Sequence, residues 1–270
     1  MKPEVEAFFD PATFTWTYVV MDPDSNQSAI IDPVLDYDPA SGRTSTESAD
    51  SVIDFVRRKG LKVDWIIETH VHADHLSGAS YLKEVLGGRT GIGSQVTAVQ
   101  DVFGDLFNAE SEFARDGSQF DHLFADNETL SIGGLEAQVW HTPGHTPACV
   151  TYVFDGAAFV GDTIFMPDFG TARTDFPGGD ARTLFMSIKR ILSLPEDTVL
   201  YLCHDYETES RSEFCSTTTV AAERAHNIHV SDAISADEFV AFREKRDAGL
   251  AAPRLLLPSV QFNMRGAAFA

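Results

Sequence analysis

The chain has 270 residues, and its 20 Lys and Arg against 41 Asp and Glu give a formal net charge of −21. A field of that sign repels phosphate backbones, so nucleic acid is not an expected partner, and no apolar run of about 18 residues is present to cross a membrane. The first residues lack the apolar stretch of a secretory signal and only three widely spaced Cys occur, so we expect a cytoplasmic protein without a disulfide framework.

Apolar runs separated by turn residues predict strands and helices along the chain. Strands are expected over residues 17–21, 28–32, 63–67, 129–132, 136–140, 150–154, 158–160 and 198–203. Helices are expected over residues 48–59, 77–86, 96–107, 181–192, 217–227 and 236–246. Loops are expected over 37–46 and 110–126, and the Pro- and Leu-rich tail from Pro253 is expected to be extended.

The predicted strands gather in two groups, each followed by helices. This order favours an α/β protein built as a four-layer αββα sandwich over a simple alternating βαβ sheet. We expect a single domain over residues 1–270, with C-terminal helices and the extended tail, roughly 205–270, packed on it.

The strongest chemical signal is the stretch 69–75, Thr-His-Val-His-Ala-Asp-His, which follows the predicted strand 63–67. It holds three imidazoles and one carboxylate, those of His70, His72, Asp74 and His75. Imidazole and carboxylate together are a common ligand set for Zn and Fe, and open α/β sheets carry their sites at the carboxyl ends of strands. The stretch therefore predicts a metal site rather than a loop with surface histidines.

Three further polar segments also follow predicted strands directly. They are His141-Thr142-Pro143-Gly144-His145, Gly161-Asp162-Thr163 and His204-Asp205-Tyr206. Because each begins where an apolar strand ends, all four segments can converge on one sheet edge.

In order and spacing, these four segments resemble the metal motifs of the metallo-β-lactamase superfamily over nearly the whole chain, which implies the αββα fold. The subfamily signal is the stretch 170–176, Gly-Thr-Ala-Arg-Thr-Asp-Phe, with Asn263-Met264-Arg265 near the end. Both are similar to persulfide dioxygenases of the ethylmalonic-encephalopathy-protein type, although Thr171 and Ala172 separate Gly170 from Arg173 where the closest pattern is compact. Glyoxalase II, the nearest rival, usually has a Cys-containing stretch after Gly-Asp-Thr, which is missing here.

The resemblance implies one Fe(II) per chain, held by His70, His145 and Asp162. Two imidazoles and one carboxylate on one face of the metal are typical of non-haem Fe(II) enzymes that activate O2. The implied reaction, a step of sulfide oxidation, converts glutathione persulfide, O2 and water to sulfite and glutathione. The resemblance also leaves open a homodimer and a sulfurtransferase upstream in the pathway.

A hydrolase remains the alternative: a glyoxalase II-like enzyme that cleaves hydroxyacylglutathione with two metal ions such as Zn. Four side chains would then complete a second metal site, His72, Asp74, His75 and His204. In the dioxygenase the same four would orient ligands and water through hydrogen bonds. The sequence does not distinguish these roles.

Two side chains are candidates for substrate binding. Arg173 could pair with a glutathione carboxylate through its planar fork, or form a loop ion pair with Asp168 or Asp175. Tyr206 could donate a hydrogen bond to the substrate, or be a partly buried structural residue. Asn263 is expected to tie down the tail.

Overall fold

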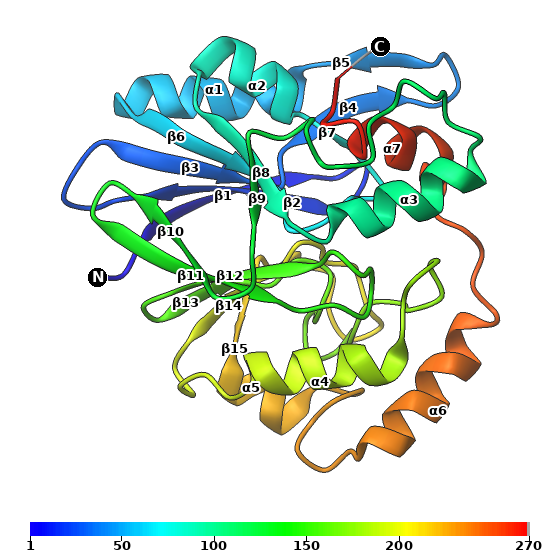
Figure 1. Ribbon diagram of the computed structural model, residues 1–270. Coiled ribbons are helices and arrows are strands. Elements are labelled where there is room, and N and C mark those ends of the chain that lie inside the picture. Colours follow the sequence, from blue (N-terminus) through cyan, green and yellow to red (C-terminus); the bar gives the residue numbers. More distant parts are fainter. Residues whose placement is uncertain (269–270) are drawn as a thin grey trace.

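The computed structural model describes residues 1–268, in which two six-stranded sheets pack face to face and helices cover both outer sides (Figure 1). The first sheet has the order β1 (Glu4–Asp10), β2 (Thr15–Met21), β3 (Gln27–Ile31), β6 (Lys62–Ile67), β8 (Arg89–Gly93), β9 (His122–Phe124). The second has the order β10 (Glu128–Ile132), β11 (Leu135–His141), β12 (Val150–Phe154), β13 (Ala157–Phe159), β14 (Val199–Tyr201), β15 (Thr217–Thr219). The predicted four-layer αββα sandwich is confirmed.

Helices from different parts of the chain cover the two sheets. The first sheet is covered by α1 (Glu47–Lys59) and α2 (Ala79–Leu86). The second sheet is covered by α4 (Ala181–Ile191), α5 (Val220–His226) and α6 (Ala236–Asp247). At one end, α3 (Val96–Leu106) packs with α7 (Leu256–Asn263) beside the loop that follows β6.

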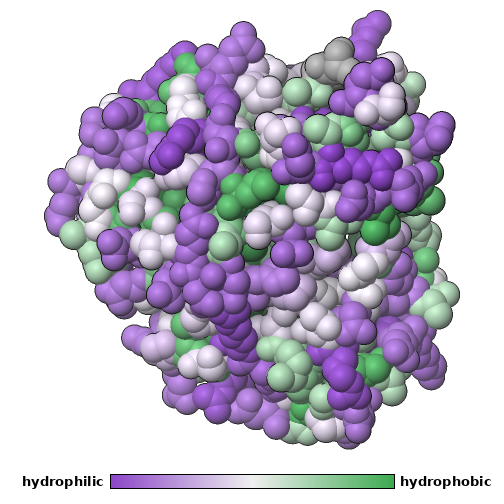
Figure 2. Space-filling view, in the orientation of Figure 1, coloured by the Kyte–Doolittle hydropathy of each residue, from purple (hydrophilic) through white to green (hydrophobic). Residues whose placement is uncertain are grey.

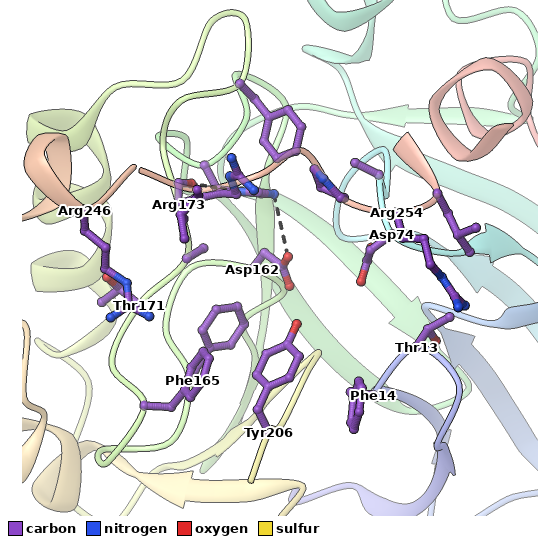
Figure 3. Close-up of a pocket in the computed structure, with 18 of the residues that line it drawn as sticks. Thr13, Phe14, Asp74, Asp162, Phe165, Thr171, Arg173, Tyr206, Arg246 and Arg254 are labelled. Atoms are coloured by element: carbon purple, nitrogen blue, oxygen red, sulfur yellow. Dashed lines mark hydrogen bonds and ion pairs between the residues drawn. The ribbon is translucent and has the colours of Figure 1, made fainter. Parts of the chain in front are cut away.

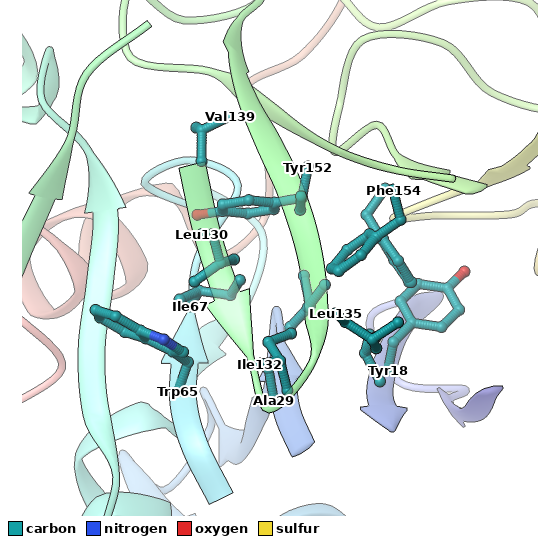
Figure 4. Close-up of a cluster of buried hydrophobic side chains, with 14 of the residues drawn as sticks. Tyr18, Ala29, Trp65, Ile67, Leu130, Ile132, Leu135, Val139, Tyr152 and Phe154 are labelled. Atoms are coloured by element: carbon teal, nitrogen blue, oxygen red, sulfur yellow. The ribbon is translucent and has the colours of Figure 1, made fainter. Parts of the chain in front are cut away.

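The space between the sheets is filled by alternate side chains of their strands, because successive residues of a strand point to opposite faces. Trp65 and Ile67 of β6 meet Leu130 and Ile132 of β10 and Tyr152 of β12 (Figure 4). Full burial of such a side chain stabilises the fold by about 1.5–3 kcal/mol. This core holds the carboxyl ends of the strands, and so the loops after them, in fixed positions.

The prediction of a loop over 37–46 is wrong. The hairpin of β4 (Val34–Asp38) and β5 (Arg43–Ser45) occupies this stretch, and β4 also pairs with β7 (Leu76–Ser77) in a small third sheet. All three residues of β5 are exposed, so its sequence lacks the apolar alternation that marks a strand.

The expectation of an extended tail is also wrong, because residues 256–263 form α7. The expectation rested in part on Pro258, because proline usually breaks a helix. Here Pro258 lies in the first turn of α7, where a backbone N–H would have no partner within the helix, so proline is tolerated. Strands β1, β7, β8 and β9 were not predicted; β9 lies in the stretch 110–126 that was expected to be a loop, and residues 217–219 form β15 rather than the start of a helix.

The surface is mostly hydrophilic (Figure 2), as the high content of acidic residues leads one to expect. Hydrophilic side chains cover most of the face seen in Figure 2, and apolar ones occur there in small groups. The longest helix of the described range 1–268 is α1, with 13 residues, and no helix in that range is long and apolar enough to span a bilayer.

Candidate metal centre

The four polar segments singled out in the sequence meet at one edge of the sandwich. They follow β6, β11, β13 and β14, and their His and Asp side chains form adjoining groups of potential metal ligands. In the turn after β11, Gly144 has a φ of 136°, and a Cβ there would lie 2.3 Å from the backbone of Leu184 in α4. Only glycine allows this close approach, which places His145 at the centre.

The first group consists of His70, His145 and Asp162, and all three are buried. The Oδ2 atom of Asp162 lies 3.7 Å from His70 Nε2 and 3.6 Å from His145 Nε2. Ligand atoms about 2.1 Å from one metal ion are separated by about 3.0–3.5 Å at coordination angles near 90–110°. The observed spacing therefore fits a single ion held by these three side chains.

The second group consists of the four other candidates, whose ligand atoms all lie within 4.8 Å of one another: His72, Asp74, His75 and His204. His204 Nε2 lies 3.1 Å from Asp74 Oδ2 and 3.3 Å from Asp162 Oδ1. Asp162 thus presents one oxygen to each group and links them.

Within residues 1–268, the imidazoles of the two groups are hydrogen-bonded through one ring nitrogen each. His145 Nδ1 donates to the backbone oxygen of Arg173 at 2.8 Å, and His204 Nδ1 donates to the backbone oxygen of Phe14 at 3.2 Å. A hydrogen bond at one ring nitrogen fixes the tautomer and leaves the other nitrogen with a lone pair for a metal.

The opposite ring nitrogens have no hydrogen-bond partner within the described part of the chain, although they are buried. These atoms are Nε2 of His70, His75 and His204 and Nδ1 of His72. Asp162 Oδ1 is likewise buried without a hydrogen-bond partner among residues 1–268. A buried polar atom without a hydrogen-bond partner destabilises the folded state by about 1–3 kcal/mol. The presence of several such atoms at one place therefore requires an explanation. A bound metal ion supplies one, and this donor set fits Zn or Fe.

The pKa shifts of His70 and Asp74 favour metal binding, whereas those of His72 and His204 do not. Burial lowers the pKa of the His72 and His204 imidazoles, but the neighbouring carboxylates outweigh it and raise the pKa of both. Burial and the neighbouring imidazoles lower the pKa of His70 well below its ordinary value, so its ring is neutral. Burial opposes ionisation of Asp74, but the charge of His204 and a hydrogen bond from His75 hold the pKa of Asp74 well below its usual range. Neutral imidazoles and ionised carboxylates are the forms that bind metal ions.

Two acidic residues behind the candidate ligands were missed in the sequence. His72 Nε2 lies 3.1 Å from both Asp32 Oδ1 and Glu68 Oε2, which orient its Nδ1 toward the second group. Asp32 also accepts from the backbone N–H of Thr69 at 2.7 Å. Asp32 follows β3 directly, so the rule that located the other segments would have located it too.

Asn263 has a larger role than tying down the tail. Its Nδ2 donates to the backbone oxygens of His72 and His75 at 2.9 and 2.8 Å, and its Oδ1 accepts from the N–H of Ser77. The C-terminal helix α7 therefore fixes the loop that carries the candidate ligands His70, His72, Asp74 and His75.

A cavity of about 560 Å³ opens onto both groups, with Asp74, His145 and Asp162 in its wall (Figure 3). Aromatic side chains form much of the remaining wall: Phe14, Phe165, Phe169, Phe176 and Tyr206. The Tyr206 ring stacks on Phe169 at 4.6 Å, and its hydroxyl points toward Asp162. Burial and the Asp74 and Asp162 carboxylates raise the pKa of Tyr206 well above its ordinary value, so it stays a hydrogen-bond donor.

Arg173 lines the cavity, but its guanidinium is already paired. Its Nε and Nη2 each donate to the Asp175 carboxylate at 2.6 Å, and its Nη1 donates to the backbone oxygen of Ala251. The guanidinium groups of two other cavity arginines, Arg246 and Arg254, make no hydrogen bond or ion pair with residues 1–268, although the charge of Arg254 helps to lower the pKa of Asp38. They were missed because neither lies near a motif.

Comparison with known proteins agrees on the superfamily, while the relatives carry hydrolase, glyoxylase and dioxygenase names. The sequence profile of the metallo-beta-lactamase superfamily matches residues 10–204. A probable metallo-hydrolase of Burkholderia pseudomallei is 57% identical over 97% of this chain and 92% of its own length. Glyoxylase B2 of Dictyostelium discoideum is 48% identical over 98% and 91%, and the mitochondrial persulfide dioxygenase ETHE1 of Bos taurus is 31% identical over 95% and 86%. The crystal structure of ETHE1 from Myxococcus xanthus has a TM-score of 0.78 at 27% identity, covering 98% of this chain and 100% of that one.

Proposed function

The chain belongs to the metallo-β-lactamase superfamily, and from this premise we propose that it is a persulfide dioxygenase. The proposed reaction takes glutathione persulfide, O2 and water to glutathione, sulfite and two protons. The observation that carries the proposal is the group of His70, His145 and Asp162, two imidazoles and one carboxylate beside a large cavity. The likeness to ETHE1 in sequence and structure supports it.

In this proposal one Fe(II) is held by His70, His145 and Asp162. When bound, it supplies a centre where a thiolate and O2 are held together and electrons pass between them. His72, Asp74, His75 and His204 orient the ligands and water around that centre. The aromatic wall excludes bulk water, which strengthens the electrostatic interactions inside the cavity.

The substrate is proposed to be recognised by its charges and its sulfur. Glutathione has two carboxylates, and Arg246 and Arg254, drawn on opposite sides of the cavity in Figure 3, are cations without an ion pair among residues 1–268 that can bind one each. The Tyr206 hydroxyl donates a hydrogen bond toward the sulfur. Arg173, which Asp175 already neutralises, contributes to the wall beside the substrate. A sulfurtransferase upstream would supply the persulfide.

A second candidate is a hydroxyacylglutathione hydrolase with two metal ions. It is favoured by the completeness of the second group, whose three histidines all present an unpartnered nitrogen, and by the 48% identity to Glyoxylase B2. In that enzyme Asp162 would help to hold both ions, since each of its two oxygens faces one group.

The test is O2 uptake by the Fe(II)-loaded protein given glutathione persulfide, with sulfite measured in the same vessel. We expect one sulfite for each O2 consumed, and neither with the Asp162→Ala variant. Absence of uptake with iron confirmed in the protein would overturn the proposal. Hydrolysis of S-lactoylglutathione by the Zn-loaded protein would then support the second candidate.

A further inference from the structure

One peptide group beside the metal centre is hydrogen-bonded on both sides. It joins Arg173 to Thr174. Its carbonyl oxygen accepts from His145 Nδ1 at 2.8 Å, and its N–H donates to Asp247 Oδ2, also at 2.8 Å. The Thr174 hydroxyl donates to the same carboxylate oxygen at 3.1 Å. His145 and Asp247 are therefore connected through a single rigid plane.

Asp247 lies at the end of α6 and is buried, with 4% of its surface exposed. Its other oxygen accepts from Arg243 Nε at 2.9 Å and Nη2 at 2.6 Å. Arg243, 1% exposed, also donates through Nη1 to the backbone oxygen of Thr171 at 3.0 Å. Burial of two charges is costly unless they are paired and hydrogen-bonded, so this pair is held in one geometry.

The chain that carries this peptide is also fixed from its other end. The N–H of Thr171 donates to His229 Nδ1 at 3.1 Å, and Asn227 Nδ2 donates to the backbone oxygen of Gly170. A Cβ at Gly170 would lie 2.0 Å from His229 Nδ1, and its φ is 101°, so only glycine fits there. The stretch 170–174 is thus held by the segment after α5 and by α6.

We infer that Asp247 is a positioning residue of the metal centre, acting on His145 through the Arg173–Thr174 peptide. An ionised acceptor on the N–H polarises the peptide and makes its carbonyl a stronger acceptor for the imidazole N–H. That bond keeps the hydrogen on Nδ1 and the lone pair on Nε2, the atom that faces Asp162. The inference rests on the ligand role proposed for His145, but not on which reaction the centre catalyses.

The test measures binding of Co(II) and Zn(II) to the whole chain, independently of turnover. Asp247→Asn keeps the side-chain shape and removes the charge, and we expect a 10–100-fold higher Kd with an altered Co(II) visible spectrum. Asp247→Glu, which restores the carboxylate, should recover part of the affinity. The matched control is Phe239→Leu, a buried apolar residue of the same helix, which should leave Kd and spectrum unchanged.

The outcomes separate the inference from the ligand assignment. Wild-type Kd and spectrum in Asp247→Asn, with affinity lost in His145→Ala, would overturn the inference alone. Unchanged binding in His145→Ala would overturn both. Equal losses in Phe239→Leu and Asp247→Asn would mean that only the stability of α6 matters. If Asp247→Asn does not fold, Arg243→Lys, which keeps the charge but loses the paired donors, must shift the Co(II) spectrum for the inference to stand.

Discussion

Removal of the His204 imidazole distinguishes one-metal from two-metal chemistry at this centre. His204 Nε2 approaches Asp162 from the Oδ1 side, at 3.3 Å, whereas His70 and His145 face Oδ2. His204→Ala therefore leaves the first ligand group intact and removes a member of the second.

The expected magnitude follows from the contacts that are lost. In a mononuclear iron enzyme, Asp74 Oδ2 loses its neighbour at 3.1 Å and Asp162 Oδ1 its neighbour at 3.3 Å, while every direct ligand remains. Loss of such outer contacts typically costs 10–100-fold in activity, or about 1.4–2.8 kcal/mol of transition-state stabilisation. In a dinuclear hydrolase the same change removes a direct ligand, so the second ion and the thioesterase activity should both be lost.

The assay compares bound iron after gel filtration with O2 uptake and sulfite formation in the same preparation. We expect one iron per chain and measurable, reduced turnover. His122→Ala, which removes a half-buried imidazole on β9 paired with Glu128, serves as a control and should match the wild type. Loss of iron from His204→Ala, in a protein whose thermal unfolding curve shows that it is still folded, would refute the assignment of His204 as a residue that orients the metal ligands without binding the metal.

Three further predictions concern the cavity, the fold and the metal. Arg246→Ala and Arg254→Ala should each raise KM for glutathione persulfide about 10–100-fold with kcat little changed, because a charge-assisted hydrogen bond contributes about 1.5–3 kcal/mol; a fall in kcat alone would contradict this. Burial raises the pKa of Glu223 from 4.5 to about 8, so the folded state retains a proton that the unfolded state releases between these values. Unfolding free energy should therefore fall with rising pH in that window, by at most about 1.4 kcal/mol per unit, and urea titrations of Glu223→Gln should show a shallower slope. Chelation should lower the thermal midpoint and added metal restore it, since an ion that binds only the folded state stabilises it by about 4 kcal/mol at 1,000 times Kd; an unchanged midpoint would count against a tightly held ion.

Much of the candidate site could be located from the sequence because its signals are local. Short apolar runs rich in β-branched residues predict strands wherever they occur, and the ligand segments follow β6, β11, β13 and β14 directly. Helix α1 begins within one residue of its prediction and ends at Lys59, directly before Gly60, whose φ of 66° suits a glycine at a helix end. The order of these elements was enough to predict the αββα sandwich.

Elements whose stability comes from distant contacts were not predictable in this way. The exposed strand β5 and the helix α7 lack a local pattern, since β5 is held by pairing with β4 and α7 by its packing on α3 and the ligand loop. Tertiary packing overrides weak local propensity in such segments.

The sequence by itself determined which side chains are available to hold a metal and which strand ends carry them, because both follow from residues adjacent in the chain. The tertiary structure alone decided how Asp162 divides its oxygens between two groups and which cavity arginines form no ion pair within residues 1–268. It also decided that Asp247 reaches His145 through a peptide 73 residues away in the chain. Hydrogen bonds of that kind depend on how helices and sheets pack, and no local pattern of residues encodes them.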